Sequence, residues 1–409
     1  MTSETFRMER DHIADQTPLR GVRARRQIWQ GALLLCAAAC GGPGGASSQQ
    51  GSAPATAAGT PFQTTQVAQF TTPWAIAFLP GRGNSALVTE KEGKLWLVDA
   101  ANGRKTAVAG VPMVKADGQG GLGDVVPHPD FARNGRVYLT WVEGGANGTS
   151  GAVLGYAQLA MAGGKPTLQG LKTIWRQSPK VEGNGHFSHR IAFGPDGLLY
   201  LSSGDRQKFD PAQDLGGNLG KVLRLTAEGT PAPGNPWASR GGVAAEFWSI
   251  GHRNILGLSF APDGRLWESE MGPKGGDEVN LVQPGKNYGW PKASDGSHYD
   301  GRDIPDHRAG DGFEPPKVNW TPSISPGGLM IYSGDRFAAW KGDALVPALS
   351  GKSLIRVDIN GDQAAKADQW EMEGRIRAVA QGPDGAVYLL EDGGRGSQGR
   401  MLRLDPPKP

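Results

Sequence analysis

Short runs in which hydrophobic and polar residues alternate recur along the chain from residue 62 onward, and most contain a Pro-Asp-Gly turn or an equivalent turn. Alternation with a period of two is typical of β-strands, since successive side chains point to opposite faces. Proline presets the first residue of a tight turn, and glycine accepts the positive φ that such turns need. Three clear copies and three looser copies of this unit lie at residues 190–201, 258–267, 378–389, 75–83, 124–131 and 329–357.

The spacing of these units predicts how the strands are arranged. The units start roughly every 50 to 70 residues, which suits four-stranded propeller blades with loops inserted between strands. A β-sandwich is the alternative, but a sandwich has no reason to repeat one turn at this spacing. We therefore expect an all-β fold, a six-bladed β-propeller of four-stranded antiparallel blades over residues 62–409. Loops from every blade of such a ring meet around one mouth, so a site there would be assembled from residues far apart in sequence.

Composition and charge narrow the functional classes. Gly 63 and Pro 30 account for about a fifth of the 409 residues, which favours many short strands over a helical bundle. The formal charge of +3 comes from 43 basic and 40 acidic residues scattered along the chain, so no nucleic-acid partner is predicted. No Gly-x-Gly-x-x-Gly follows a strand into a predicted helix and no Gly-x-Ser-x-Gly occurs, which disfavours nicotinamide use and serine hydrolysis.

The N-terminal part of the chain predicts export followed by a tether. Residues 1–40 are interpreted as an export signal of the lipoprotein type, because basic residues precede the apolar run 31–39 and small residues stand directly before Cys40. The apolar run is too short to span a bilayer. Cleavage after Ala39 without lipidation and twin-arginine export are the alternatives. The uncharged, Gly/Ser/Ala-rich residues 41–61 are typical of a flexible linker, and we predict an exported, periplasmic protein that is anchored through lipid on Cys40.

Candidate chemistry is concentrated in the segment 270–291. It combines carboxylates, amides and Gly/Pro carbonyls without one His or Cys, and an oxygen-only ligand set suits a hard cation, above all Ca²⁺. An isolated acidic loop is more often simply solvated. Further along, Arg375 and Arg377 point to one face of a strand by alternation. The only cysteines, Cys36 and Cys40, lie in the leader, so the folded part has no thiol nucleophile or cysteine-ligated metal.

Three segments resemble the glucose/sorbosone dehydrogenase family, whose members are soluble quinoproteins that oxidise aldose sugars with pyrroloquinoline quinone (PQQ) and calcium. They are residues 183–190, 251–257 and 270–291, and the resemblance covers residues 66–407. It is nearer to the bacterial aldose sugar dehydrogenase branch, because the insertions of the larger soluble glucose dehydrogenases are absent. The resemblance implies an oxidoreductase that converts the anomeric C1 hydroxyl of aldoses to lactones by hydride transfer to PQQ, and that passes electrons to an external acceptor.

The resemblance also implies roles for single residues. His186 would be the catalytic base for the anomeric hydroxyl, and Arg253 would stabilise the developing quinone oxyanion. His189 is the weaker candidate base, because relatives carry Gly there, and a lone loop His is more often structural. Relatives have a Lys at the position of Ser350, for which Lys352 would substitute. The residues implied to bind the cofactor are Gln119, Arg253, Asn254, Ser323, Lys352, Arg375 and Arg377.

Two calcium sites are implied in the same way. The backbone carbonyls of Gly272 and Pro273 would hold one ion against PQQ. A second, structural ion would be bound by the side chain of Glu278 and the carbonyl of Tyr288. Without the resemblance, a Gly-Pro pair would be a weak signal, because its ligands do not depend on side-chain identity.

Two other functional classes remain open at this stage. A non-catalytic propeller could bind a ligand or a protein partner, although the combination of His186, Arg253 and the arginine pair argues against it. A calcium-dependent, lactonase-like hydrolase should instead present acidic side chains from several blades to the ion. The preferred sugar, the physiological electron acceptor and the oligomeric state do not follow from the sequence.

Overall fold

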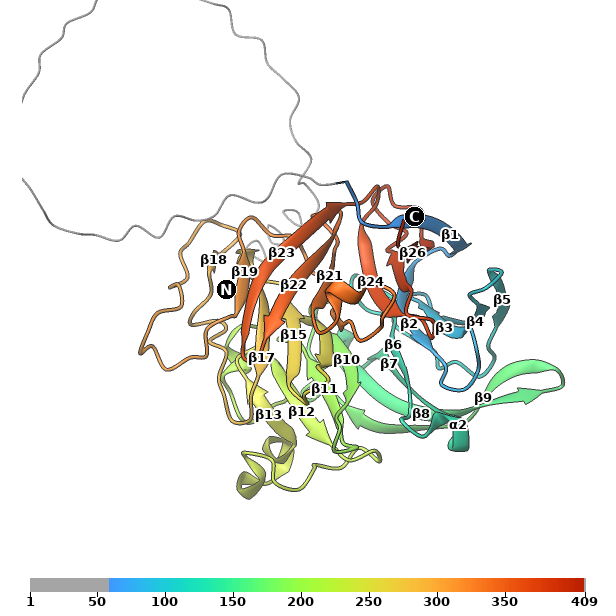
Figure 1. The fold of residues 1–409 in the computed structure, drawn as a ribbon. Coiled ribbons are helices and arrows are strands. Elements are labelled where there is room, and N and C mark those ends of the chain that lie inside the picture. The colour runs from blue at the N-terminus through green and yellow to red at the C-terminus, as the bar shows by residue number, and fades with distance from the viewer. Residues whose placement is uncertain (1–58, 408–409) are drawn as a thin grey trace, which may run out of the picture. The chain divides into compact units, whose positions relative to one another are not determined.

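The computed structural model describes residues 59–407, and within them it contains six four-stranded antiparallel sheets, which confirms the predicted six-bladed propeller (Figure 1). The predicted export signal over residues 1–40 and most of the linker over 41–61 lie outside the described residues. The first three blades are built from β2 (Pro73–Phe78), β3 (Ser85–Glu90), β4 (Lys94–Asp99) and β5 (Arg104–Ala107); β6 (Leu122–Pro127), β7 (Arg136–Gly144), β8 (Ser150–Ala162) and β9 (Lys165–Arg176); and β10 (Ser188–Phe193), β11 (Leu199–Ser203), β12 (Lys221–Leu225) and β13 (Phe247–Ile250).

The other three blades are given in the same order, from the innermost strand outward. They are built from β14 (Ile255–Phe260), β15 (Leu266–Glu270), β17 (Asp277–Val282) and β19 (Val318–Trp320); β20 (Met330–Ile331), β21 (Ala344–Ala348), β22 (Ser353–Asn360) and β23 (Gln363–Glu371); and β24 (Ile376–Gln381), β25 (Val387–Glu391), β26 (Arg400–Asp405) and β1 (Gln63–Gln69). A small sheet and short helical turns lie in the connections: β16 (Lys274–Gly275) with β18 (Gly296–Ser297), α2 (Phe131–Asn134), η1 (Ala146–Gly148), η2 (Asp210–Ala212), η3 (Ala238–Arg240), η4 (Gly242–Glu246) and η5 (Ala338–Trp340).

The last blade closes the ring with strands from both ends of the folded part. Strand β1 pairs antiparallel with β26, with Gln63 opposite Asp405, so that the blue and red ends of the ribbon lie side by side (Figure 1). Around the centre, β2 contacts both β6 and β24, β10 contacts β6 and β14, and β20 contacts β14 and β24. The six inner strands therefore form a closed circle.

The core lies between neighbouring blades, because both faces of each sheet are covered. On β11, Leu199 and Leu201 pack into the cluster shared with the second blade, whereas Tyr200 packs into the cluster shared with the fourth. This is the arrangement that the period-two pattern requires when both faces are buried. In the Pro-Asp-Gly turns, Gly197 and Gly264 have φ of 75° and 86°, as the turn motif predicts.

Five of the inner strands are irregular at their beginnings. The pairing register shifts between Ser188 and Ile191 in β10 and between Ile255 and Gly257 in β14, with equivalent shifts in β2, β6 and β24. Such bulges re-aim side chains and are frequent next to active sites. The end of the ring where the inner strands begin is thus the place where side chains leave the regular pleat.

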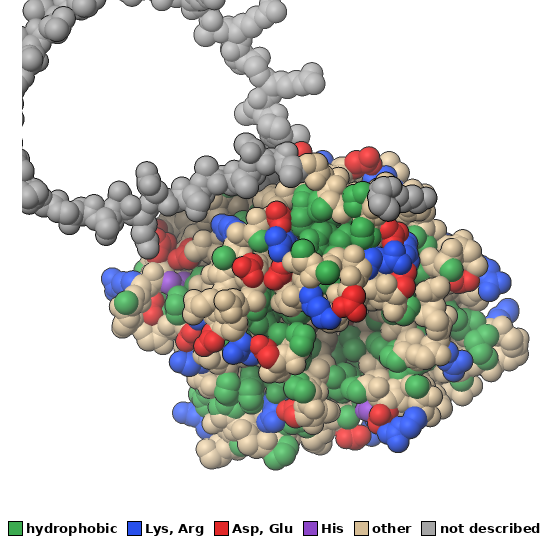
Figure 2. Space-filling model, viewed as in Figure 1, with side chains coloured by type: hydrophobic (Ala, Val, Ile, Leu, Met, Phe, Trp, Pro, Cys, Tyr) green, Lys and Arg blue, Asp and Glu red, His purple; other side chains and the backbone are tan. Residues whose placement is uncertain are grey.

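Two further observations concern the surface. Within residues 59–407, no helix is both long enough and apolar enough to cross a bilayer. On the face drawn in Figure 2, Lys and Arg side chains are interspersed with Asp and Glu side chains, as the near-balanced composition leads one to expect.

Candidate active site

The candidate residues gather where the inner strands begin. His186 precedes β10, Arg253 and Asn254 precede β14, and the Arg375–Arg377 pair stands at the start of β24. Gln119 comes before β6, and its side-chain Oε1 accepts the backbone N–H of His186 at 2.8 Å. Residues from separate blades therefore lie at the end of the ring where the inner strands begin, as expected of a propeller fold.

His186 is held by a carboxylate that the sequence analysis did not identify. His186 is 4% exposed, and its Nδ1 lies 2.7 Å from Oδ1 of Asp205, a fully buried residue on the loop after β11. Oδ1 of Asp205 also accepts the backbone N–H of Gln207 at 2.8 Å. An ionised carboxylate can only accept, so Nδ1 carries the proton and donates it to Asp205. Nε2 of neutral His186 is then left with its lone pair, which is the state a general base needs.

Burial and the charge of Arg253 keep His186 neutral. Burial, followed by the positive charge of Arg253, lowers the pKa of His186, and Asp205 opposes this only in part. Burial raises the pKa of Asp205, but its contacts with His186 and Arg253 outweigh burial and bring the pKa below its ordinary value. The pair is therefore a neutral imidazole beside an ionised carboxylate at neutral pH.

The loop that carries His186 is constrained by Arg206. The backbone of His186 has a φ of 49°, in the left-handed region that non-glycine residues rarely adopt. The buried guanidinium of Arg206 donates to the carbonyls of Gly185 at 2.9 Å and Gly183 at 2.5 Å, and it lies over the ring of Phe187 at 3.8 Å. A strained loop persists only when its surroundings determine it from several sides, and Arg206 supplies several of those contacts.

His189 has a different environment from His186. Its ring stacks on Trp74 at 5.1 Å, and its Nδ1 lies 2.9 Å from Oγ1 of Thr140. Burial, with smaller effects of Arg190 and Arg206, lowers the pKa of His189 to about 3. A buried histidine packed in this way is a structural residue, in line with its lower rank in the sequence analysis.

Arg253 combines a fixed position with a free donor. Its Nη1 donates to the carbonyl of Met271 at 2.9 Å, and its guanidinium lies 5.2 Å from the ring centre of Trp290. Its Nε is buried without a hydrogen-bond partner among the described residues. Oε2 of Glu270 fixes the backbone, because it accepts the N–H groups of both Arg253 and Asn254 at 2.6 and 3.1 Å.

The remaining cationic candidates occupy a neighbouring part of the mouth. Arg375 and Arg377 both approach Oδ2 of Asp392, at 2.9 and 3.8 Å, so they share one face as predicted. Burial lowers the pKa of Arg377 to about 10, which still leaves it charged. Lys91 connects this pair to the loop that carries Gln119. It lies within the electrostatic influence of Arg377 and Asp392, and its Nζ donates to the carbonyl of Gly118.

Lys352 is exposed and lies on the loop after β21. This loop contacts the one that carries Ser323, because Oγ of Ser350 donates to the carbonyl of Ser323 at 3.2 Å and lies 2.8 Å from Oγ of Ser325. The displaced lysine therefore stands on a loop that borders the candidate site.

The loop that contains Gly272 and Pro273 is tied to Ser323 through Asp277. Oδ1 of Asp277 accepts the N–H of Gly272 at 2.9 Å, and Oδ2 accepts Oγ of Ser323 and the backbone N–H groups of Ile324 and Ser325, each at 2.7 Å. Burial raises the pKa of Asp277, but these four donors favour its ionised form. Asp277 therefore links the loop with the predicted calcium ligands Gly272 and Pro273 to the loop with the predicted cofactor-binding residue Ser323.

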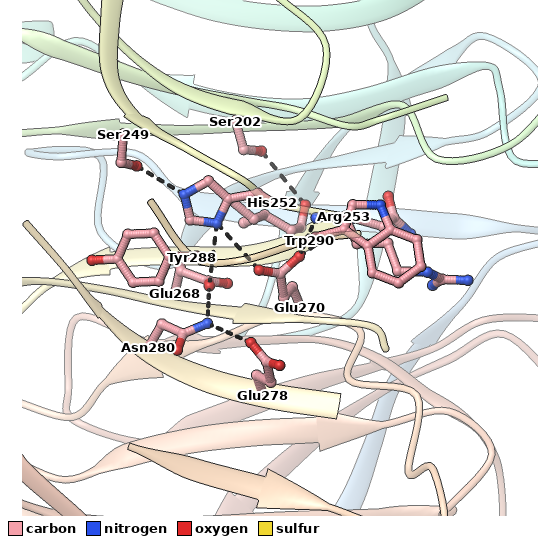
Figure 3. A network of polar contacts seen from close by, with 12 residues as sticks. Ser202, Ser249, His252, Arg253, Glu268, Glu270, Glu278, Asn280, Tyr288 and Trp290 are labelled. Carbon is pink, nitrogen blue, oxygen red and sulfur yellow. Dashed lines mark hydrogen bonds and ion pairs between the residues drawn. The ribbon is translucent and has the colours of Figure 1, made fainter. Parts of the chain in front are cut away.

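Behind this loop lies a buried group of acidic and amide side chains (Figure 3). Nδ2 of Asn280 donates to Glu268 at 2.7 Å and to Glu278 at 3.0 Å, and Nδ1 of His252 lies 3.2 Å from Oε1 of Glu270. Burial, followed by the negative charge of Glu270, raises the pKa values of Glu268 and Glu278 well above the ordinary range. A cation would relieve this repulsion.

Buried oxygens without a hydrogen-bond donor also indicate that this acidic group suits a cation. Oε2 of Glu268 and Oδ1 of Asn280 are buried and accept no hydrogen bond from the described residues. Glu278, which accepts Nδ2 of Asn280, lines a pocket together with Arg253, Gly272, Tyr288 and Trp290, among others. Buried oxygens without donors fit a hard cation, so the residues present suit calcium.

Three residues with clear contacts in the site were missed by the sequence analysis. Asp205 and Arg206 lie in residues 202–209, which contain no metal or nucleophile motif. Their contacts with the His186 loop depend on left-handed backbone conformations in this segment. Trp290 lies within the segment 270–291, but nothing in the sequence indicates that its indole reaches Asp205. One signal could have identified Asp205. It is an acidic residue between β11 and β12, the second and third strands of the blade that begins just after His186.

Comparisons with known proteins agree with this architecture. The family model for glucose/sorbosone dehydrogenases matches residues 70–403. The aldose sugar dehydrogenase YliI of Escherichia coli (strain K12) is 39% identical over 339 residues, which cover 82% of this chain and 90% of that protein. The crystal structure of the soluble aldose sugar dehydrogenase from Escherichia coli in the apo-form has a TM-score of 0.79 at 37% identity, with 85% of this chain and 100% of that chain covered.

A PQQ-bound relative has also been solved. The structure of the aldose sugar dehydrogenase from Streptomyces coelicolor in its PQQ-bound form has a TM-score of 0.69 at 31% identity, and it covers 84% of this chain and 98% of that chain. These matches extend over nearly the whole propeller rather than over one blade. The chain therefore belongs to the glucose/sorbosone dehydrogenase family.

Proposed function

We propose that this protein is a PQQ-dependent aldose sugar dehydrogenase that oxidises the anomeric C1 hydroxyl to a lactone and passes the electrons to an external acceptor. One observation carries the proposal above all others. A neutral imidazole, His186, is oriented by the buried carboxylate of Asp205 and lies within the field of the Arg253 guanidinium. This combination provides a base and a fixed positive charge in one mouth.

His186 would take the proton of the anomeric hydroxyl at Nε2, because Nδ1 is engaged with Asp205. The imidazolium that forms would be stabilised by the ionised carboxylate. When bound, PQQ supplies a quinone that accepts the hydride from C1. Arg253 would stabilise negative charge on the acceptor side, and its unpartnered Nε–H is a donor available for that purpose.

The proposed cofactor-binding residues suit a ligand with three carboxylates. The Arg375–Arg377 pair, Lys352 and Arg253 supply positive charge, and charge-assisted hydrogen bonds to carboxylates are among the stronger polar contacts in proteins. The neutral donors proposed beside them are the side chains of Gln119, Asn254 and Ser323. The ion pairs of Arg375 and Arg377 with Asp392 orient the two guanidiniums without neutralising both.

We also propose two calcium sites. The carbonyls of Gly272 and Pro273 would bind an ion next to the cofactor, and Asp277 would hold that loop in place. Glu278 and the carbonyl of Tyr288 would bind a second, structural ion, for which the buried, unpartnered oxygens nearby are the support. Export to the periplasm and lipidation of Cys40 also remain proposals, based on the leader alone.

Dye reduction by the purified protein tests this function. The full chain with added PQQ and calcium should reduce a dye in the presence of aldoses, and activity should require both additions. His186→Ala should retain PQQ but lose turnover by roughly 10²- to 10⁴-fold, the usual contribution of a general base. His128→Ala, on the connection after β6, is the matched control. Full turnover in His186→Ala would refute the assignment, and failure of the wild-type chain to bind PQQ would favour a non-catalytic propeller.

A further inference from the structure

The indole of Trp290 contacts both halves of the proposed catalytic machinery. Its Nε1 donates to Oδ2 of Asp205 at 2.8 Å, and its ring lies 5.2 Å from the guanidinium of Arg253. We propose that Trp290 is a positioning residue that keeps Asp205 ionised and oriented, and through Asp205 keeps His186 in its basic tautomer. The inference rests on the proposed function for its catalytic meaning, but the contact itself can be tested independently.

The two oxygens of Asp205 have different partners. Oδ1 receives His186 and the backbone N–H of Gln207, at 2.7 and 2.8 Å. Among residues 59–407, Oδ2 receives one hydrogen bond, and the donor is Trp290. Since Asp205 is fully buried, water cannot replace a lost donor at that oxygen without rearrangement. The indole N–H therefore fixes the carboxylate plane from the side opposite His186.

Trp290 is itself held firmly. Its backbone N–H donates to Gly251 at 3.0 Å, and its carbonyl accepts Nε2 of Gln213 at 2.7 Å. Its ring lies beside Phe209, with 5.5 Å between ring centres. The close view shows the indole next to the extended side chain of Arg253 (Figure 3). An anchored ring of this kind transmits a fixed position to Asp205 rather than adapting to it.

Other tryptophans show that a buried indole N–H need not be paired in this protein. Nε1 of Trp248 and Nε1 of Trp267 are buried without partners among the described residues. Replacing Trp248 by Phe removes an indole nitrogen that makes no hydrogen bond among the described residues, so this variant reports a smaller ring without the loss of a hydrogen bond. It is a matched control for Trp290→Phe.

Removal of the N–H at residue 290 has a defined electrostatic consequence. The groups that face His186 are the carboxylate of Asp205 and the guanidiniums of Arg253 and Arg206. Without the indole donor, the negative charge of Asp205 is less stabilised and attracts the proton on His186 more strongly. His186 should then remain protonated to higher pH, so the acid limb of kcat/KM should move upward by roughly 0.5 to 1 pH unit. The value of kcat should fall about tenfold, with KM for the sugar changed less than about threefold.

The first test compares full-length wild type, Trp290→Phe and Trp248→Phe, each with PQQ and calcium. The proposal expects the upward shift in Trp290→Phe and a wild-type profile in Trp248→Phe. In an Asp205→Asn background, Trp290→Phe should have no further effect on kcat, because the indole acts through the carboxylate. An unchanged profile in Trp290→Phe, an equal shift in both tryptophan variants, or full additivity with Asp205→Asn would each overturn the proposal.

A second measurement does not depend on turnover. The ¹⁵N resonances of His186, assigned with His186→Ala, report its tautomer and titration in the PQQ-free chain. Benzothienylalanine at position 290 replaces the indole N–H by sulfur with nearly the same shape, so it tests the hydrogen bond even where Phe destabilises the fold. If His186 stays protonated to higher pH in the variant than in wild type, the proposal is supported. If the pH at which His186 loses its proton is unchanged, the proposal is overturned. If wild type binds PQQ and oxidises no aldose, the proposed function fails, while this titration still decides the role of Trp290.

Discussion

At the scale of single residues, two histidines three positions apart show how environment decides chemistry. His186 contacts the carboxylate of Asp205, which orients its ring. His189 contacts a hydroxyl and aromatic rings, and burial lowers its pKa to about 3. The same side chain is thus suited to proton transfer at one position and to packing at the other.

The buried His189 predicts a specific pH dependence of stability. Its folded-state pKa is about 3, below the ordinary value of about 6.5, so the unfolded chain binds a proton there that the folded chain does not. Stability from this residue is therefore present above pH about 6.5 and is lost as pH falls from there toward 3. At pH 4.5 the loss should be about 2 to 3 kcal/mol relative to pH 7.5.

Urea unfolding of wild type and His189→Gln at the two pH values measures this loss. His189→Gln should show a smaller decrease in the free energy of unfolding on acidification, by about the same 2 to 3 kcal/mol. His128→Gln, at a partly exposed histidine, is the comparison. An identical acid sensitivity in wild type and His189→Gln would show that His189 titrates normally in the folded protein.

At the scale of elements, loops and strand beginnings carry the site while the regular strands carry the fold. The register shifts at the starts of β10 and β14 fall beside His186 and Arg253. The opposing loop is fitted closely, because a Cβ at Gly204 would lie 2.1 Å from the carbonyl oxygen of His186. A bulge frees a side chain from the pleat, and an adjacent glycine allows the second loop to approach it.

Arg206 provides a prediction at this scale. Arg206→Lys keeps a positive charge but loses the planar fork that binds the carbonyls of Gly183 and Gly185. The His186 loop should loosen, and kcat should fall by about 10- to 100-fold, because small misplacement of a catalytic group is costly. PQQ binding should be retained.

Hydrogen exchange over residues 183–187, measured together with turnover, distinguishes the causes. The Arg206→Lys chain should exchange faster in this loop, whereas Arg133→Lys, at an exposed arginine of α2, should match wild type in both respects. Normal turnover with faster exchange would mean that the loop geometry is not important for catalysis. Normal exchange would mean that other contacts suffice to hold the loop.

At the scale of the whole molecule, the ring depends on a strand contributed from the other end of the folded part. Strand β1 completes the sixth blade by pairing with β26. Just before β1, the ring of Phe62 packs edge-on against Trp340 and Trp370, with ring centres 6.3 and 5.5 Å apart. Phe62 therefore anchors the closing strand against the fifth blade.

Phe62→Ala should weaken this closure without altering the site. Truncation of a buried phenylalanine typically costs about 3 to 5 kcal/mol, and we expect a loss near the lower end because Phe62 is at the edge of the core. Urea unfolding of Phe62→Ala and of Thr64→Ala, an exposed position of β1, measures the difference. The pH profile of turnover should be unchanged in both variants, and a stability equal to that of Thr64→Ala would show that Phe62 is not an anchor.

Much of the architecture could be predicted from the sequence because its signals are local. Period-two alternation and the Pro-Asp-Gly turns determine strands and hairpins, and their repetition determines the number of blades. The resemblance singled out His186, Arg253 and Arg377, and the structure has each of them at or just before the start of an inner strand. The roles of these residues remain predictions.

Only the tertiary structure decided which distant side chains meet. Asp205 reaches His186 because two loops adopt left-handed conformations that no local pattern encodes, and Trp290 reaches Asp205 across 85 positions of sequence. The closure by β1 and β26 likewise depends on a pairing between the two ends of the folded part. Sequence periodicity reports which face of a strand is buried, whereas contacts between blades depend on how the closed ring places whole elements beside one another.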